Sequence, residues 1–263
     1  MALPEDAHIA SVSLTVRDLG RSVAFYRDVL GFRVGKHTAV AAALSADGTR
    51  TLIELHERKD AVLRPRRCTG LFHFAILVPD RAALGRSLRH LVEQDRALTG
   101  VADHLVSEAL YLNDPDGLGI EIYRDRPRET WNRVNGQIAM ATDPLDLQSV
   151  ANEPGAERPW TGLEAGTVIG HVHLHVASLV DAERLYCGIV GFEPMVRTYP
   201  GALFVAAGGY HHHLGLNTWM GEGAPPPPEH VVGLRSFTVE STSLTPTELV
   251  DNNTRVSVLL TRT

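Results

Sequence analysis

Apolar and polar residues alternate in a short stretch near the start of the chain, and helical spacing replaces that alternation directly afterwards. Successive side chains of a strand point to opposite faces, so Val12, Leu14 and Val16 would share one face and the polar residues between them the other. The apolar positions that follow have the spacing of one buried helical stripe: Val23, Phe25, Tyr26 and Leu30. The pattern predicts a strand, a turn and an amphipathic helix.

This pattern occurs four times, which indicates internal repeats. The repeated segments span residues 11–32, 73–94, 171–192 and 234–250. The first and third match most closely, and both end in Gly-Phe. Each segment predicts a strand and then a helix, and further strand signals and turn residues follow. Each repeat is therefore interpreted as one βαβββ module, of which the fourth, reaching Thr263, is short.

The modules predict an α+β fold in three parts. Residues 1–125 would hold an N-terminal pair of modules, and residues 167–263 a C-terminal pair whose last module is short. Residues 126–166 are rich in Pro, Asp and Glu and are predicted to be a linker. In the second module the turn residues 113–117 (Asn-Asp-Pro-Asp-Gly) precede a strand over 118–123.

Composition and charge narrow the function classes. The 263 residues are 44% hydrophobic and 21% charged, which is typical of a soluble globular protein. The chain has no apolar run near the roughly 18 residues that cross a bilayer, and its first residues lack the features of a signal peptide, so a cytoplasmic location is expected. A net charge of −6 argues against nucleic acid as a partner. Cys68 and Cys187 alone do not make a disulfide scaffold.

Histidine is the unusual residue in this chain. There are 13 histidines, and several are clustered. His171, His173 and His175 alternate along one predicted strand, and residues 211–213 are three consecutive histidines. Histidine is the commonest metal ligand and the usual acid or base near neutral pH. The clusters therefore indicate a metal site or an acid/base site inside the repeats.

Several long segments resemble one protein family. They are GLFHFAIL, DHLVSEALYLNDPDGLGIEIYRDRP, IGHVHLHV and ALFVAAGGYHHHLGLNTW. Together with the repeated βαβββ unit they resemble the vicinal oxygen chelate superfamily, which includes glyoxalase I, fosfomycin-resistance proteins and type I extradiol dioxygenases. They are most similar to its two-domain bacterial catechol 2,3-dioxygenase branch. The resemblance implies that the four modules pair to form two cupped mixed sheets, with metal ligands on the first and last strands of paired modules.

The ligand positions follow from aligning the four first strands on their final valine. The aligned positions are Ser11, His73, His171 and Leu234. Only the second and third modules place a metal-binding side chain there. Glu121 lies in the last strand of the second module between Ile120 and Ile122, so it would face away from the apolar side. Burying a carboxylate there is costly unless it is paired or bound to a metal.

His73, Glu121 and His171 form a set of two histidines and one carboxylate. This set suits non-haem Fe(II), because it leaves open coordination positions, and Mn(II) uses the same ligands. His173 shares the predicted strand face of His171 and is the alternative ligand. Each histidine could instead be a core residue, and Glu121 could pair with a nearby arginine. The three positions taken together favour the metal site.

The ligand set also predicts which modules pair. The second module must pair with the third and the first with the fourth, since pairing in chain order would divide the ligands between two cups. In the third module Leu214 is near the position that matches Glu121, with His213 and Gly215 on the alternate face. No second carboxylate is found there. Glyoxalase I relatives generally use four ligands with two carboxylates, so the resemblance favours the oxygenase.

The resemblance implies roles for three further residues. His212 corresponds to the catalytic acid/base histidine of extradiol enzymes, although three histidines in a row can also form a turn or an adventitious metal patch. Tyr111 falls where family members place a tyrosine that hydrogen-bonds the substrate oxygen; it could equally be a core aromatic. His104 lies near another active-site histidine of the family, but with a different spacing to Tyr111.

The expected function is extradiol cleavage of catechol-type rings by O₂ at one Fe(II), giving a 2-hydroxymuconic semialdehyde-type product. Two other classes stay open: a glyoxalase-like lyase, isomerase or thiol transferase on the same fold, and a non-enzymatic protein that binds small molecules. The sequence does not specify the ring substituents. An exposed sheet edge after the short fourth module favours association into a homo-oligomer.

Overall fold

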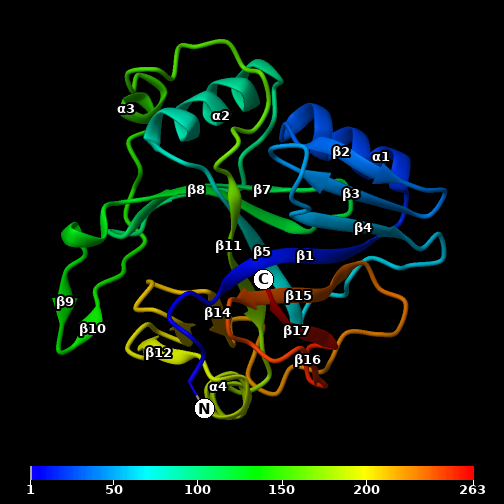
Figure 1. Cartoon of the computed structure of the whole chain (residues 1–263), viewed down its shortest axis with the longest axis vertical. Coiled ribbons are helices and arrows are strands. Elements are labelled where there is room, and N and C mark those ends of the chain that lie inside the picture. The colour runs from blue at the N-terminus through cyan, green and yellow to red at the C-terminus, as the bar shows by residue number, and fades with distance from the viewer. Residues whose placement is uncertain (1) are drawn as a thin grey trace.

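The computed structural model describes residues 2–263 and contains two large mixed sheets of seven and eight strands, with a small two-stranded ribbon beside them (Figure 1). The first module contains β1 (His8–Val16), α1 (Leu19–Ala24), the π-helical turn η1 (Phe25–Val29), β2 (Arg33–His37), β3 (Ala41–Ser45) and β4 (Ile53–Glu57). The second contains β5 (Gly70–Leu77), α2 (Arg81–Glu93), β6 (Gly100–Asp103), β7 (Ser107–Asn113) and β8 (Gly119–Asp125).

The third module contains β11 (Val168–His175), α4 (Leu179–Glu183), the π-helical turn η3 (Arg184–Val190), β12 (Glu193–Val196), β13 (Ala202–Ala206) and β14 (Leu214–Asn217). The fourth contains β15 (Gly233–Ser241), β16 (Thr247–Asp251) and β17 (Val256–Arg262). Between the second and third modules lie η2 (Arg128–Thr130), β9 (Arg133–Val134), β10 (Gln137–Ile138) and α3 (Leu147–Ala151).

The first three modules have the predicted βαβββ order, and capping residues start their helices. Asp18, Asp80 and Ser178 each follow a strand, and each side chain accepts a hydrogen bond from the backbone N–H three residues later. This contact satisfies one of the free N–H groups at a helix start. The chain therefore changes from strand to helix at the same point in each module.

The fourth module departs from the expectation of a strand followed by a helix. Thr247–Asp251 is strand β16, which pairs antiparallel with β17, so the predicted helix is wrong. The few residues between Ser241 and Thr247 include Pro246 and leave no room for a helix and a further strand. β16 instead takes the place of a third strand, and Leu249 packs against the core.

The crossed pairing of modules is confirmed. In the eight-stranded sheet the order is β12-β13-β14-β11-β5-β8-β7-β6, so the third module joins the second through β11 and β5. In the seven-stranded sheet the order is β16-β17-β15-β1-β4-β3-β2, so the fourth joins the first through β15 and β1. Figure 1 shows β1, in blue, beside β15, in orange, although they come from opposite ends of the chain.

The two sheets share one register at their centres. β1 and β15 pair with irregularities at Ala10 and Arg235, and β11 and β5 pair with the same irregularities at Gly170 and Phe72. This correspondence makes Ser236, rather than Leu234, the counterpart of His73. The sequence alignment had treated Val239 as the end of this strand. That alignment was wrong, because β15 continues for two more residues, to Ser241.

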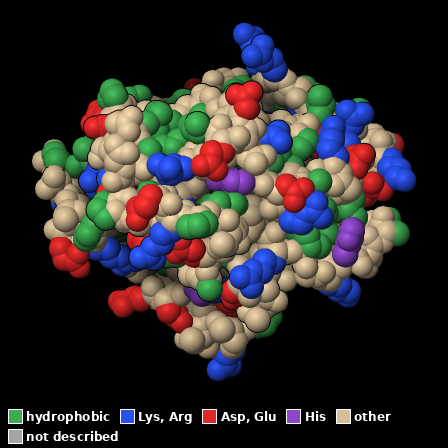
Figure 2. All heavy atoms as spheres, turned by 90° about the horizontal axis from the view of Figure 1, so that it is seen from above, with side chains coloured by type: hydrophobic (Ala, Val, Ile, Leu, Met, Phe, Trp, Pro, Cys, Tyr) green, Lys and Arg blue, Asp and Glu red, His purple; other side chains and the backbone are tan. Residues whose placement is uncertain are grey.

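The apolar faces of both sheets and the helices pack into one large core. Leu14, Phe74, Val172 and Phe237 at the two central strand pairs are fully buried in it. The alternate residues of β5 and β11, including His73 and His171, consequently face the opposite side of the eight-stranded sheet. None of the helices in residues 2–263 has the length and hydropathy that a membrane crossing requires. The face in Figure 2 carries acidic and basic side chains interspersed with apolar patches.

Two buried tyrosines tie neighbouring modules together at matching places. Tyr26, in η1, donates a hydrogen bond to Asp114 Oδ2 in the turn between β7 and β8, at 3.3 Å. Tyr186, in η3, donates to Asp251 Oδ2 at the turn between β16 and β17, at 3.0 Å. Each aspartate also accepts backbone N–H groups of its own turn. The shortened fourth module therefore keeps the anchor used in the second.

Tyr186→Phe should lower the free energy of unfolding by about 1–3 kcal/mol, because it removes a hydroxyl donor from the buried Asp251 carboxylate. Urea unfolding followed by circular dichroism measures the change. Tyr199→Phe is the matched control, since its hydroxyl bonds Thr142 in an exposed place and should cost less. Equal stability of Tyr186→Phe and the wild type would contradict the anchor.

Candidate metal centre and active site

The candidate metal centre lies on three adjacent strands of the eight-stranded sheet. β11, β5 and β8 are neighbours in the sheet and carry His171, His73 and Glu121 respectively. Each of these residues has apolar neighbours along its strand that point into the core, such as Phe74 and Val172. Strand alternation therefore turns all three polar side chains to the same side of the sheet.

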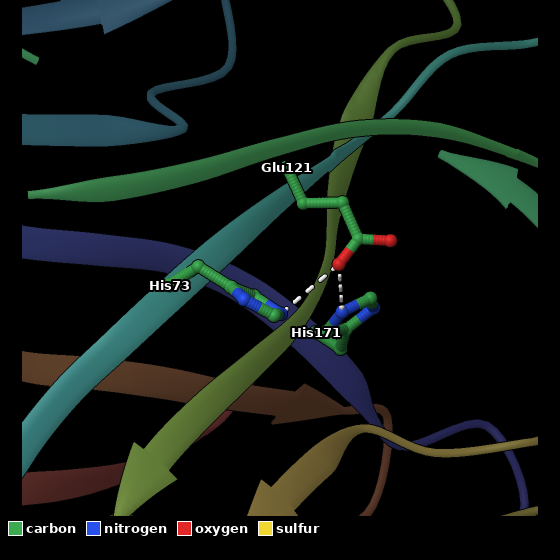
Figure 3. Close-up of side chains that lie close together, drawn as sticks. All are labelled: His73, Glu121 and His171. Atoms are coloured by element: carbon green, nitrogen blue, oxygen red, sulfur yellow. Dashed lines mark hydrogen bonds and ion pairs between the residues drawn. The ribbon is translucent and has the colours of Figure 1, made fainter. Parts of the chain in front are cut away.

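The three side chains converge on one carboxylate oxygen (Figure 3). His73 Nε2 lies 3.0 Å and His171 Nε2 3.1 Å from Glu121 Oε2. One potential ligand atom from each residue lies within 4.8 Å of the other two. The sequence prediction named these three residues, and the fold brings all three together.

The donor atoms of this cluster are deeply buried, and part of their hydrogen-bonding capacity is unused. Burial lowers the pKa of His171 to about 4, so its imidazole is neutral and able to bind a metal. Burial opposes ionisation of Glu121, but the two histidines outweigh it and hold the Glu121 pKa well below its usual value. His73 Nε2 makes no hydrogen bond within residues 2–263, despite its short distance to Glu121. A buried nitrogen without a partner is costly, and a metal ion would satisfy it.

His173, the alternative ligand, is held away from the cluster by Asn217. Asn217 Oδ1 accepts hydrogen bonds from the Trp219 backbone N–H and from His175 Nδ1. This fixes the amide orientation, so Asn217 Nδ2 donates to His173 Nε2 at 2.9 Å. His173 Nε2, the atom that matches the ligand nitrogens of the cluster, is thus already hydrogen-bonded, which leaves His171 as the candidate third ligand.

The register also identifies the counterpart of Glu121 in the third module. Glu121 pairs with Ala75, two residues after His73, and Gly215 pairs with His173, two residues after His171. The matching position is therefore Gly215, one residue after Leu214, whose side chain faces the core. A Cβ on Gly215 would lie 2.7 Å from the His173 ring. The ring thus covers the place where a second carboxylate would stand.

A cavity of about 540 Å³ opens beside the cluster. Its lining is mainly apolar and includes four aromatic side chains besides Tyr111, namely Phe72, Tyr199, Phe204 and Trp219. His73, Glu121 and His171 reach its wall, as do His173 and His212. No lysine, arginine or aspartate within residues 2–263 lines it. The cavity therefore suits a neutral or weakly polar ring next to the metal centre.

The other three predicted residues also line this cavity. The ring centroid of His212, in the segment before β14, lies 4.1 Å from that of His171. Tyr111, on β7, pairs with Glu121 across the sheet. His104 Nδ1 donates to the carbonyl of Ala141 at 2.6 Å, so in the neutral ring Nε2 accepts the Tyr111 hydroxyl at 2.7 Å. His104 and Tyr111 are thus one hydrogen-bonded unit.

Part of the cavity wall comes from the segment predicted to be a linker. Residues 140–142 line the cavity, and three contacts hold them there. They are the His104–Ala141 bond, a bond between the Thr142 and Tyr199 hydroxyls, and backbone pairing of Asp103 with Asp143. No sequence pattern predicts this wall, because these residues have no periodicity and are held in place by contacts with other modules.

The sequence comparisons define the class of protein. Residues 7–122 match the model of the Glyoxalase/Bleomycin resistance protein/Dioxygenase superfamily, and one relative is 51% identical over 242 residues, or 90% of this chain. The chain belongs to this superfamily, which is the vicinal oxygen chelate group expected from the sequence. That relative is the catechol-2,3-dioxygenase of Bacillus subtilis (strain 168), of which the alignment covers 84%.

Solved structures agree on the fold. A putative dioxygenase from Bacillus subtilis subsp. subtilis str. 168 aligns with a TM-score of 0.58 at 14% identity, covering 98% of this chain and 86% of that one. Glyoxalase I from Zea mays aligns with a TM-score of 0.57 at 13% identity, covering 97% and 92%. At these identities the structures establish the shared fold, and the α+β vicinal oxygen chelate prediction is confirmed.

Gly215→Ala should destabilise the protein by about 1–3 kcal/mol, because the added methyl group collides with the His173 ring. Gly100→Ala is the control, since its Cβ would meet only the Tyr111 side chain at 3.8–4.0 Å. Unfolding in urea compares the two variants. A Gly215→Ala protein as stable as Gly100→Ala would show that His173 does not occupy this position.

Proposed function

We propose that this protein is an extradiol dioxygenase that opens catechol-type rings at one Fe(II) ion held by His73, Glu121 and His171. The observation that carries the proposal is the ligand set itself: two imidazoles and one carboxylate within 4.8 Å, at the wall of a mainly apolar cavity. The similarity to the Bacillus subtilis catechol-2,3-dioxygenase supports the same reaction. Both atoms of O₂ would enter the substrate as a ring C–C bond breaks, giving a 2-hydroxymuconic semialdehyde-type product.

The donor set fits Fe(II) on the chemistry of its atoms. His73 Nε2 is buried, has no hydrogen-bond partner within residues 2–263 and points to the Glu121 carboxylate, which is the arrangement a shared ion would complete. His73, Glu121 and His171 would hold ferrous iron through two nitrogens and one carboxylate, a donor set that would leave positions open for the substrate and O₂. Mn(II) takes the same donors, so metal analysis is part of the test below.

The surrounding residues would bind the ring and handle its protons. Phe72, Phe204 and Trp219 form apolar walls that exclude water and hold an aromatic ring beside the cluster. His212 reaches the cavity next to His171, where its Nε2 can take a proton from a catechol hydroxyl and return it later. The Tyr111 hydroxyl donates its hydrogen bond to His104 Nε2, so its oxygen is left to accept a hydrogen bond from a substrate hydroxyl.

Gly215 supports this proposal over a glyoxalase-like reaction. The position that matches Glu121 has no side chain to offer a fourth ligand, and the His173 ring fills the space in front of it. A four-ligand centre with two carboxylates would need a rebuilt strand β14. A centre with three protein ligands keeps more positions open for substrate and O₂.

Replacing the two adjacent histidines separately tests the ligand assignment. After anaerobic loading with Fe(II), the wild type and His173→Ala should each bind about one iron per chain, and His171→Ala should bind far less. Wild type given catechol should take up oxygen and form a yellow semialdehyde, and His171→Ala should do neither. Metal analysis, an oxygen electrode and absorbance provide the readouts.

The opposite result for the two variants, with iron lost in His173→Ala and kept in His171→Ala, would overturn the ligand assignment. Failure of folded, iron-loaded wild type to consume oxygen with catechol and several substituted catechols would overturn the dioxygenase proposal itself. Loading with Mn(II) in parallel decides which metal supports turnover.

The apolar lining predicts a preference among substrates. Alkyl- and aryl-substituted catechols should be turned over with a kcat/KM at least about 100-fold higher than catechols carrying a carboxylate, because no lysine or arginine within residues 2–263 lines the cavity to pair the charge, and burying an unpaired carboxylate against its mainly apolar wall is costly. Steady-state oxygen uptake with 3-methylcatechol, 3-phenylcatechol and 3,4-dihydroxyphenylacetate compares the classes. Equal kcat/KM values for the neutral and carboxylated substrates would contradict this reading of the cavity.

A further inference from the structure

A second group of polar residues, the buried His211 and the partly exposed Asp125, lies directly behind His212, outside the cavity lining. His211 is fully buried, and its Nδ1 lies 2.7 Å from His212 Nδ1. Its other nitrogen, Nε2, lies 2.8 Å from Asp125 Oδ1 at the end of β8. Asp125, His211 and His212 therefore form a continuous line of hydrogen bonds that ends at the cavity.

The direction of each hydrogen bond in this line follows from the carboxylate. An ionised carboxylate only accepts, so His211 must donate from Nε2. A neutral imidazole has one N–H, and His211 Nδ1 is therefore left as an acceptor. His212 must then donate from its Nδ1, which leaves Nε2 of His212 without a proton.

Two tyrosines hold the carboxylate from its other side. Tyr210 donates to Asp125 Oδ2 at 2.9 Å, and its oxygen lies 2.8 Å from the Tyr123 hydroxyl, which must then be the donor to Tyr210. A Cβ on Gly170 would lie 1.7 Å from the Tyr123 hydroxyl oxygen. The glycine at the irregularity in β11 thus leaves room for this tyrosine, and every bond of the network points toward Asp125.

The free nitrogen of His212 faces the reaction space. Its Nε2 has no hydrogen-bond partner within residues 2–263, while the ring lines the cavity beside His171. Phe204 packs edge-on against the His212 ring, and Trp131 packs edge-on against that of His211. These contacts leave the rings little freedom to turn, so the hydrogen bonds define which nitrogen is presented.

We propose that Asp125 and His211 are positioning residues that fix His212 in the Nδ1–H tautomer, with Nε2 presented to the substrate as a base. This inference rests on the proposed dioxygenase function for its catalytic consequence, but the tautomer itself is a property of the folded chain. A histidine in the opposite tautomer would present an N–H and would be unable to accept the substrate proton.

The tautomer is measured on metal-free protein labelled with ¹⁵N-histidine. Long-range ¹H–¹⁵N correlation spectra separate protonated from unprotonated ring nitrogens, and His212→Gln identifies the His212 signals. Wild type should show a protonated Nδ1 and an unprotonated Nε2 for His212. In His211→Phe this pattern should be lost, because the Nδ1 acceptor is gone. A wild-type His212 protonated at Nε2 would overturn the proposal.

Kinetics of the iron-loaded protein test the consequence. His211→Phe should lower kcat for catechol by about 10- to 100-fold, less than the roughly 100- to 10,000-fold that acid/base catalysis contributes in full, because His212 itself is kept. The anaerobic Kd for catechol should stay within about twofold. His211→Gln should restore most of kcat, because its amide can donate to Asp125 and accept from His212. Asp125→Leu should behave like His211→Phe.

His213→Phe is the matched control, since His213 is buried in the same run but its Nδ1 accepts the Ala207 backbone N–H on the other side. It should keep kcat within about twofold. An unchanged kcat in a folded His211→Phe, or no recovery in a folded His211→Gln, would overturn the positioning role. Absence of turnover in the wild type would instead count against the dioxygenase proposal, and the spectra would still decide the tautomer.

Discussion

The antiparallel pairing of β5 with β11 is the constraint on which the site depends. It joins two modules that lie far apart in the sequence, and its irregularities at Phe72 and Gly170 set which residues stand opposite one another. That register brings His73 and His171 to one side of the sheet, and β8, parallel to β5, adds Glu121. The seven-stranded sheet has the same register with Ser11 and Ser236 at the corresponding places, so only one sheet carries the histidine pair.

The second requirement is that the polar groups buried beside this pairing find partners. Asn217 holds His173 away from the cluster, and Asp125 with His211 directs His212 toward the cavity. Unpaired, each of the buried side chains among these would cost about 1–3 kcal/mol. They are His173, His211, His212 and Asn217. The same contacts that preserve stability therefore also decide which nitrogen atoms face the substrate. Within residues 2–263 His73 Nε2 lacks such a partner, and the proposed metal ion would supply one.

Strand periodicity made much of this predictable. The alternation around His73, Glu121 and His171 identifies the three residues and the crossed pairing, because only that pairing collects them in one cup. The short-range sequence pattern could not identify Ser236 as the counterpart of His73, or Gly215 as the counterpart of Glu121. Irregular strand ends shift the register there by one or two residues. The same pattern predicted a helix before Asp251. In the structure these residues form strand β16, because pairing with β17 outweighs their local preference for a helix. Partners such as Asp125 and Asn217, and the cavity wall formed by residues 140–142, depend on contacts between modules that no local pattern reports.

The most direct test of the central claim is the position of the metal. Crystals grown after anaerobic loading with Fe(II) should give one strong anomalous difference peak at the iron absorption edge, within coordination distance of His73 Nε2, the Glu121 carboxylate and His171 Nε2. That result would establish that the second and third modules build a single centre through the β5–β11 pair. A peak on His173 and His175, or one in the seven-stranded sheet, would contradict the account.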